Sequence, residues 1–158
     1  MPKLDLNTIA RRTGSGYPAP FHEICAGRIR RALGDAGGLT QFGVNLLQLA
    51  PGTASSQRHW HSDEDEFVIV LSGVVVLVTD RGEVTLQTGD CAAFPGGAPN
   101  GHQLVNRSGA MAVCLEVGSR IPGDSAVYPD IDLLYDGKTD AYTHRDGTPY
   151  PKRPDPHT

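Results

Sequence analysis

The sequence has 158 residues, enough for one domain with a sizeable core but too few for two full domains. Its net charge of −4 and the absence of a block rich in Lys and Arg exclude a basic surface for nucleic acid or anionic lipid, which favours a small-molecule partner. Nineteen glycines and twelve prolines in a chain that is 39% hydrophobic indicate many short elements joined by tight turns, as in an all-β domain.

Two features bear on the compartment. No apolar run of about 18 residues could span a membrane, and the stretch "MPKLDLNTIARRTG" lacks the apolar core of a secretory signal. The cysteines Cys25, Cys91 and Cys114 are odd in number and have no C-x-x-C spacing, so we interpret them as buried free thiols. These observations predict a cytoplasmic protein without a membrane partner.

Residues 1–40 are predicted to form an N-terminal arm and the first strand or strands. The Gly/Pro-rich stretch "TGSGYPAP", residues 13–20, separates the arm from the rest of the chain, and such an arm could pack on a partner subunit. The next segment, "ICAGRIRRALGD" at residues 24–35, has a periodicity compatible with a strand with outward arginines and equally with a short helix. Both alternatives stay open.

The central part of the chain, residues 41–120, contains a series of β-compatible runs. One strand is expected in residues 39–50, before the turn at Pro51 and Gly52. Six more short runs begin at residues 66, 74, 84, 91, 102 and 110, each closed by a turn residue, which predicts antiparallel pairing in a barrel or two-sheet jelly roll. The expected core residues are Phe67, Ile69, Leu71, Val74, Val76, Val78, Leu86, Phe94, Leu104, Val113 and Leu115.

Residues 121–158 are polar and rich in Pro and Tyr. We expect an ordered extension that wraps the barrel, with one short strand at residues 131–135 and then a tail that either wraps the surface or frays.

The stretch "RHWHSDEDEFVIVLSG" concentrates groups that bind metals. Residues i and i+2 of a strand point to the same face about 6.6 to 6.8 Å apart, so His59 and His61 should aim their imidazoles at one volume. The polar segment of residues 62–65 can reverse the chain and bring Glu66 back beside them. Any of Asp63, Glu64 and Asp65 could replace Glu66, but Glu66 opens the apolar run and should point inward.

The order of these residues resembles the first motif of the cupin superfamily, which Gly52, His59, His61, Glu66 and Gly73 would fill. The second cupin motif is matched by Gly89, Pro95, Gly97, His102 and Asn106. Two spacings depart from the usual pattern, with one extra residue before His59 and two extra residues before His102. Both insertions fall in predicted turns, so they should reshape the mouth of the site and leave the ligand positions in place.

The resemblance implies a small single-domain metal-binding cupin, an RmlC-like jelly roll or double-stranded β-helix whose barrel core spans residues 41–120. It also implies one divalent metal ion per chain, held by His59, His61, Glu66 and His102; the ligand set suits Zn, Fe, Mn, Ni or Co. Cupins are often dimers through their N-terminal strands, which predicts a homodimer here.

Two classes of function follow from the resemblance. The first is a metal-dependent enzyme acting on a small oxygenated metabolite, resembling the isomerases, oxygenases such as dioxygenases, or lyases of the superfamily, with catalytic residues that the sequence does not identify. The alternative is a non-catalytic module that binds or senses a small molecule. An acid or base at the mouth of the barrel would favour an enzyme, and a sugar-phosphate isomerase would need cations there, of which only Arg58 and Arg107 lie near the motifs.

Overall fold

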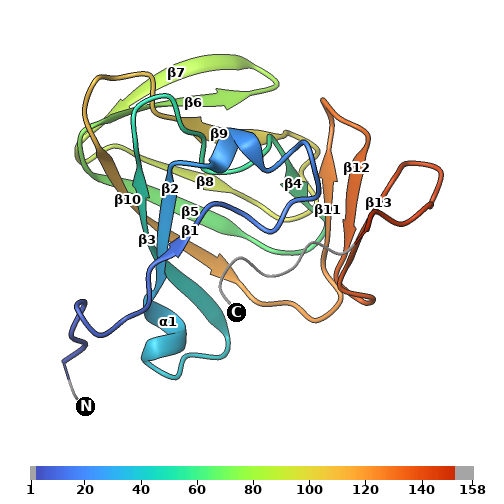
Figure 1. The fold of residues 1–158 in the computed structure, drawn as a ribbon, viewed down its shortest axis with the longest axis horizontal. Coiled ribbons are helices and arrows are strands. Elements are labelled where there is room, and N and C mark those ends of the chain that lie inside the picture. Colours follow the sequence, from blue (N-terminus) through green and yellow to red (C-terminus); the bar gives the residue numbers. More distant parts are fainter. Residues whose placement is uncertain (1–2, 152–158) are drawn as a thin grey trace.

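The computed structural model describes residues 3–151, which contain thirteen β-strands, one short α-helix and one 3-10 helix (Figure 1). In chain order the elements are β1 (Arg12–Thr13), η1 (Glu23–Cys25), β2 (Arg28–Ala32), α1 (Leu33–Ala36), β3 (Phe42–Leu49), β4 (Trp60–His61), β5 (Glu66–Ser72), β6 (Val74–Thr79), β7 (Gly82–Gln87), β8 (Cys91–Phe94), β9 (His102–Val105), β10 (Ala112–Ser119), β11 (Ser125–Tyr128), β12 (Leu133–Asp136) and β13 (Ala141–Thr143). The all-β prediction is confirmed.

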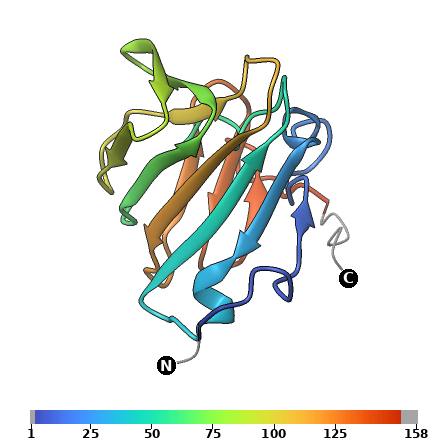
Figure 2. The same ribbon diagram turned by 90° about the vertical axis from the view of Figure 1, so that its left-hand side faces the viewer.

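The strands form two facing layers. One layer is a six-stranded sheet in the order β1-β2-β3-β10-β5-β8, whose long strands run side by side in Figure 2. The other consists of a three-stranded sheet, β7-β6-β9, and a four-stranded sheet, β13-β12-β11-β4. All the ladders are antiparallel, as predicted for a jelly roll of the double-stranded β-helix type. An isolated bridge between His59 and His102 joins the two smaller sheets.

The strand predictions for the central segment are confirmed at β3, β5, β6, β7, β8, β9 and β10. The open question at residues 24–35 is answered by both alternatives, because β2 is followed directly by α1. The arginines of β2 do not all point outward, however. Arg28 is 9% exposed, and both Arg28 and Arg30 line an internal cavity, whereas Arg31 donates a hydrogen bond to Gln48.

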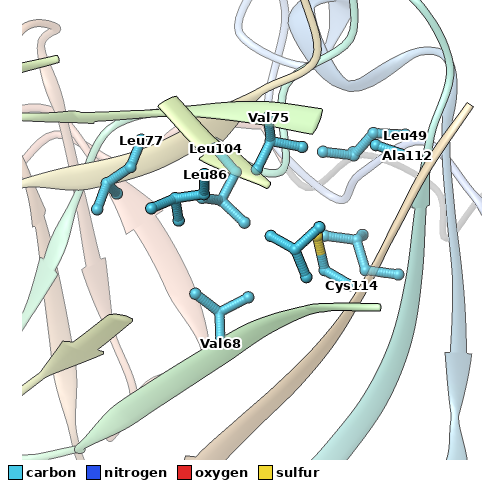
Figure 3. Packing of buried hydrophobic residues seen from close by; sticks show 10 residues of the cluster. Leu49, Val68, Val75, Leu77, Leu86, Leu104, Ala112 and Cys114 are labelled. Carbon is cyan, nitrogen blue, oxygen red and sulfur yellow. The ribbon is translucent and has the colours of Figure 1, made fainter. Parts of the chain in front are cut away.

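The main core lies between the six-stranded sheet and the β6-β7-β9 sheet (Figure 3). Side chains of both layers point toward one another in this view, with Val68 of β5 facing Val75, Leu86 and Leu104. The buried cluster is formed by Leu47, Leu49, Val68, Val70, Val75, Leu77, Leu86, Leu104, Ala112 and Cys114. The predictions of Leu86 and Leu104 are therefore confirmed, and Phe94 packs against the cluster.

The predicted phase of β5, β6 and β10 is wrong. Phe67 is 39% exposed and Leu71 is 44% exposed, because the inward side chains are those of the alternate positions. The same error applies to Ile69, Val74, Val76, Val78, Val113 and Leu115. Both faces of these strands are apolar, so alternation alone could not assign them. Since Glu66 points into the cavity, period two requires Val68 and Val70 to point inward as well.

One residue of each cupin motif has a structural role, Asn106 of the second motif and Gly73 of the first. Asn106 is fully buried, and its amide donates to the carbonyls of Leu49 and Ala110 at 2.7 and 2.8 Å. Gly73 lies between β5 and β6 with a φ of +82°, where a Cβ atom would meet the carbonyl oxygen of Met111 at 2.9 Å. Both residues therefore serve the fold, since one satisfies buried carbonyls and the other permits a close backbone approach.

The C-terminal extension contains more structure than predicted. Three strands, β11, β12 and β13, replace the single strand expected at residues 131–135, and only β12 overlaps it. They form the wall at the right of Figure 1 and pack against the N-terminal segment in a second cluster of Tyr17, Cys25, Ala126, Tyr128 and Leu133. Such short strands are bounded by Pro, Gly and Asp, so their sequence resembles that of a loop.

Three other expectations are addressed by the described residues. The cysteines are free, but Cys91 is exposed and only Cys25 and Cys114 are buried. No helix within residues 3–151 has the length and apolar character needed to cross a membrane. The N-terminal arm adds β1 to the edge of its own chain's β2, so a homodimer stays a prediction.

The assignment of inward and outward positions can be tested by truncating one buried and one exposed leucine. Leu47→Ala should lower the free energy of unfolding by about 2 to 5 kcal/mol, because it leaves a cavity at a fully buried site. Leu71→Ala should lower it by less than about 1 kcal/mol, because that side chain is 44% exposed. Urea unfolding of the two variants measures the difference, and equal losses would contradict the inward phase of β3 and the outward position of Leu71.

Candidate metal site and cavity

The candidate site begins at the bridge between the two smaller sheets. The backbone N–H of His59 donates to the carbonyl of His102 at 3.1 Å, and the N–H of His102 donates to the carbonyl of His59 at 2.8 Å. This reciprocal pair places the two imidazole rings 4.9 Å apart between centroids. His61 follows two residues later on β4, and its ring centroid lies 5.0 Å from that of His59. The same-face prediction for the two histidines of the first motif is consistent with this arrangement.

Glu66 reaches the histidines from the opposite layer. Its Oε2 lies 2.8 Å from His102 Nε2, and 3.7 Å from the Nε2 atoms of His59 and His61. Ligand atoms of His59, His61 and Glu66 all lie within 4.8 Å of one another, and His102 joins this set through Glu66. The structure thus brings together all four residues that the sequence singled out.

The other acidic residues of the turn make different contacts. Asp63 accepts a hydrogen bond from Ser62, and Asp65 accepts one from the backbone N–H of Gly96 at 2.8 Å. Glu64 accepts from the N–H of Ile121 at 2.7 Å, although it also lies near His61 and Asp124 in a second acidic group. Glu66 is therefore the carboxylate that faces all three histidines.

Hydrogen bonds fix the orientation of two imidazoles. Nδ1–H of His59 donates to the carbonyl of Gln57 at 2.9 Å, and Nδ1–H of His61 donates to Asp124 Oδ2 at 2.6 Å. A neutral imidazole that donates from Nδ1 carries its lone pair on Nε2. In both residues Nε2 is the atom that faces Glu66, so this orientation aims both Nε2 atoms at the same volume.

Asp124, which the sequence analysis missed, organises the first motif from outside it. Its carboxylate is buried, and Oδ1 accepts hydrogen bonds from Ser62 Oγ and from the N–H groups of Asp63 and Glu64, at 3.1, 2.8 and 3.2 Å. Burial opposes ionisation, but the hydrogen bond from His61 and these N–H groups lower the pKa of Asp124. It stands in a Pro/Gly-rich turn between β10 and β11, where no sequence pattern pointed to the site.

The protonation states suit a bound cation. Burial, the largest influence, lowers the pKa of His59 to about 4, so its imidazole is neutral at pH 7. Burial would raise the pKa of Glu66, but the hydrogen bond from His102 and the nearby His59 and His61 outweigh it and lower that pKa to about 2. The site therefore holds at least one neutral nitrogen ligand and one ionised carboxylate.

This donor set fits a divalent transition metal. Metal–nitrogen bonds of about 2.0 to 2.1 Å require ligand atoms roughly 3 to 4 Å apart. The separations of 3.7 Å from Glu66 to His59 and to His61 meet that requirement, and the 2.8 Å to His102 lies just below it. Imidazole and carboxylate together suit Zn, Fe, Mn, Ni or Co, so the ligand types do not choose among them.

A cavity of about 340 Å³ opens beside the histidines. Besides the predicted ligands, its walls carry Arg28 and Arg30 of β2, Glu116 of β10 and a cluster of tyrosines that includes Tyr17, Tyr128 and Tyr142. Burial raises the pKa of Tyr128 well above its usual value, so this phenol keeps its proton. A second carboxylate, Glu116, and several phenols therefore line the same cavity as the candidate ligands.

The arginines that the sequence analysis considered lie elsewhere. Arg58 forms ion pairs with Asp80 and Asp130, and Arg107 forms one with Glu83 on the surface. The sequence did not indicate Arg28 and Arg30, because they precede the first motif. They also lie in residues 24–35, where the periodicity is compatible with either a strand or a helix. Glu116 was missed because it interrupts a strand whose inward phase had been assigned to the wrong residues.

Comparison with known proteins agrees with this geometry. A family model for the Cupin domain matches residues 45–118. A solved structure of a sugar phosphate isomerase of the cupin superfamily from Silicibacter pomeroyi is 52% identical, covering 95% of this chain and 97% of its own, with a TM-score of 0.90. The chain belongs to the cupin superfamily. No curated protein sequence matches it.

Two other structures resemble this cupin. A proposed sugar phosphate isomerase from Acidithiobacillus ferrooxidans is 33% identical, covering 73% of this chain and 74% of its own, with a TM-score of 0.69. The polyketide cyclase RemF from Streptomyces resistomycificus is 19% identical, covering 75% and 79%, with a TM-score of 0.62. At that identity the likeness of RemF concerns the fold alone.

The carboxylate of Asp124 should strengthen metal binding through His61. Asp124→Asn should weaken the affinity for Zn²⁺ or Mn²⁺ about 10- to 100-fold, because an amide neither stabilises the Nδ1–H tautomer as strongly nor polarises the ring. Calorimetric titration of each ion measures the change. Asp90→Asn, a matched substitution in the turn before β8, should leave the affinity unaltered; equal affinities for all three proteins would contradict the role of Asp124.

The metal-free protein should become less stable as the pH decreases. The pKa of His59 is about 4 in the folded protein against an ordinary 6.5, so between these values the unfolded chain binds a proton that the folded chain does not. The free energy of unfolding should therefore decrease as the pH falls from about 6.5 to about 4, and Glu66, with a pKa of about 2 against 4.5, should extend the loss. Urea unfolding with a chelator measures this slope, which His59→Gln should reduce; the same slope in both proteins would be the contrary result.

Proposed function

We propose that this cupin is a divalent-metal-dependent isomerase acting on a small sugar phosphate. The observation that carries the proposal is the 52% identity with a sugar phosphate isomerase over nearly the full length of both chains. That similarity extends beyond the metal motifs, because residues 45–118 alone make up the family match while the alignment covers 95% of the chain. The alignment therefore takes in most of the chain outside the family match, which contributes part of the cavity wall.

The order of side chains across the six-stranded sheet supports the proposal. Arg30 stands on β2, Glu116 on β10 and Glu66 on β5, and these strands are arranged in the order β2-β3-β10-β5. Arg30 Nη2 lies 3.2 Å from Glu116 Oε2. At roughly 4.8 Å per strand, about 14 Å separates the first and last of these strands, which leaves Glu116 between the cation and the candidate metal ligands.

The candidate ligands, Glu116 and Tyr128 would each have a role in an isomerisation. His59, His61, Glu66 and His102 would hold the ion, which would supply Lewis-acid chemistry for the substrate carbonyl. Glu116 removes the proton from the hydroxyl-bearing carbon next to the carbonyl and returns it to the former carbonyl carbon. The hydroxyl proton passes to the former carbonyl oxygen, so the carbonyl moves by one carbon with no net change in composition. Tyr128, which keeps its proton and lines the cavity, would offer a hydrogen-bond donor to substrate oxygens.

The proposal is tested by proton exchange at carbon. The protein, loaded in turn with Mn²⁺, Fe²⁺, Co²⁺, Ni²⁺ or Zn²⁺, is incubated in D₂O with a panel of aldose and ketose phosphates of three to six carbons, and NMR follows the position of the carbonyl and deuterium at the adjacent carbon. We expect turnover with at least one pair of metal and substrate. Glu116→Gln should lower kcat about 10²- to 10⁴-fold at unchanged metal content.

The controls separate chemistry from folding. Glu83→Gln makes the same change at a surface carboxylate that pairs with Arg107, and it should keep the parent rate. The double variant with His59 and His102 replaced by alanine should lose metal in elemental mass spectrometry and lose turnover. Binding of a sugar phosphate by the metal-loaded parent without isomerisation or deuterium uptake would refute the enzyme and favour the non-catalytic binding module.

A further inference from the structure

Arg28 is a buried cation without an acidic partner. Its Nε and Nη2 donate to the carbonyl of Gly14 at 2.9 and 2.6 Å, and its Nη1 donates to the carbonyl of Ser55 at 2.6 Å. Across the described residues, 3–151, the ion pairs include none with Arg28. Burial lowers the pKa of Arg28, but a guanidinium stays charged at neutral pH. Its carbonyl partners orient the group without neutralising its charge.

Arg30 lies two residues further along β2, on the same face of the strand and in the same cavity. Its only ion pair within residues 3–151 is the one with Glu116, and its Nε is buried without a hydrogen-bond partner. A guanidinium has five N–H donors, so most of the capacity of Arg30 is unused. Side chains two residues apart on a strand are about 6.6 to 6.8 Å apart at the backbone, which lets both arginines act on one ligand.

A neutral donor completes this wall. Ser15 lines the same cavity, is 5% exposed, and its hydroxyl is buried without a hydrogen-bond partner. Buried polar groups are generally paired, so an orphaned hydroxyl and an orphaned guanidinium N–H on one cavity wall indicate a missing acceptor. Two guanidiniums face one carboxylate here, which leaves the wall with a net positive charge.

We propose that Arg28, Arg30 and Ser15 form a subsite for a phosphate monoester, on the side of the cavity that β2 and the N-terminal segment line. This inference rests on the proposed function, since it assigns the phosphate of a sugar phosphate to this wall and the carbonyl end to the histidine cluster. Arg30 binds the phosphate oxygens directly, in the forked geometry that guanidinium and phosphate share. Arg28 contributes its charge from behind, and Ser15 donates its hydroxyl hydrogen. The subsite selects a phosphorylated substrate over the free sugar.

The test uses inorganic phosphate as the probe and the full-length protein as purified. Isothermal titration, with ³¹P NMR line widths as a second measurement, compares the parent with Arg30→Gln and Arg30→Lys. We expect Arg30→Gln to weaken phosphate binding about 10- to 100-fold, and Arg30→Lys to recover part of it, because a charged hydrogen bond to an oxyanion is lost in the first and retained in the second. Arg28 is left intact, since its bonds to Gly14 and Ser55 also hold the N-terminal segment in place.

Matched controls locate the effect. Arg107→Gln removes a surface guanidinium that pairs with Glu83 and should leave phosphate affinity at the parent value. Circular dichroism and metal content of Arg30→Gln should equal those of the parent. The subsite would be overturned if Arg30→Gln left phosphate affinity unchanged, whether or not His102→Ala abolished it. It would also be overturned if the parent bound no phosphate.

The experiments distinguish a failure of the phosphate subsite from a failure of the isomerase proposal. Phosphate binding that depends on Arg30 in a protein without isomerase activity supports the subsite and removes the proposed reaction. Isomerisation with no dependence of KM on Arg30 supports the reaction and overturns the subsite. If both hold, Arg30→Gln should raise KM for the phosphorylated sugar about 10- to 100-fold.

Discussion

The backbone pairing of His59 with His102 is the interaction on which both the fold and the candidate site depend. These two reciprocal hydrogen bonds unite the β6-β7-β9 sheet with the β4-β11-β12-β13 sheet into one layer. A slip of one residue in this pairing would turn an imidazole to the opposite face of the layer. The pairing that joins the two sheets therefore also places the imidazoles of the candidate site.

The electrostatic arrangement of the cavity has two poles. At one pole, ionised Glu66 faces neutral His59, which makes a place for a cation. At the other pole, Arg28 and Arg30 exceed the single negative charge of Glu116 and make a place for an anion. A molecule that is rich in oxygen at one end and anionic at the other matches this polarity. An uncharged sugar would satisfy only one pole.

Local sequence patterns predicted much of the molecule. The strands of residues 66–119 follow from turn residues and β-branched runs, and the four candidate ligands follow from the resemblance to the two cupin motifs. The inward phase of β5 and β10 did not follow from apolar alternation, because both faces are apolar. It was nevertheless contained in the inward position of Glu66, which forces Val68 and Val70 to the same side.

The remaining parts of the site depend on contacts between distant segments. Arg30 meets Glu116, and His61 meets Asp124, across 86 and 63 positions of sequence respectively. No local pattern indicates that a Pro/Gly-rich turn will supply the carboxylate behind a histidine, or that an arginine in a short strand will face inward. Such residues are identifiable only when the sheets have been placed against each other.

Nine of the twenty residues that line the cavity come from outside the shared Cupin domain. The family match ends at residue 118, whereas Arg28 and Arg30 precede residue 45, and Asp124 and Tyr128 follow residue 118. Two proteins that share only the central segment can share the candidate ligands and still carry different residues at these flanking positions. Diversification of substrate can then proceed by exchanging the ends of the chain around an unaltered centre. Sorting such proteins by function requires comparison of their termini.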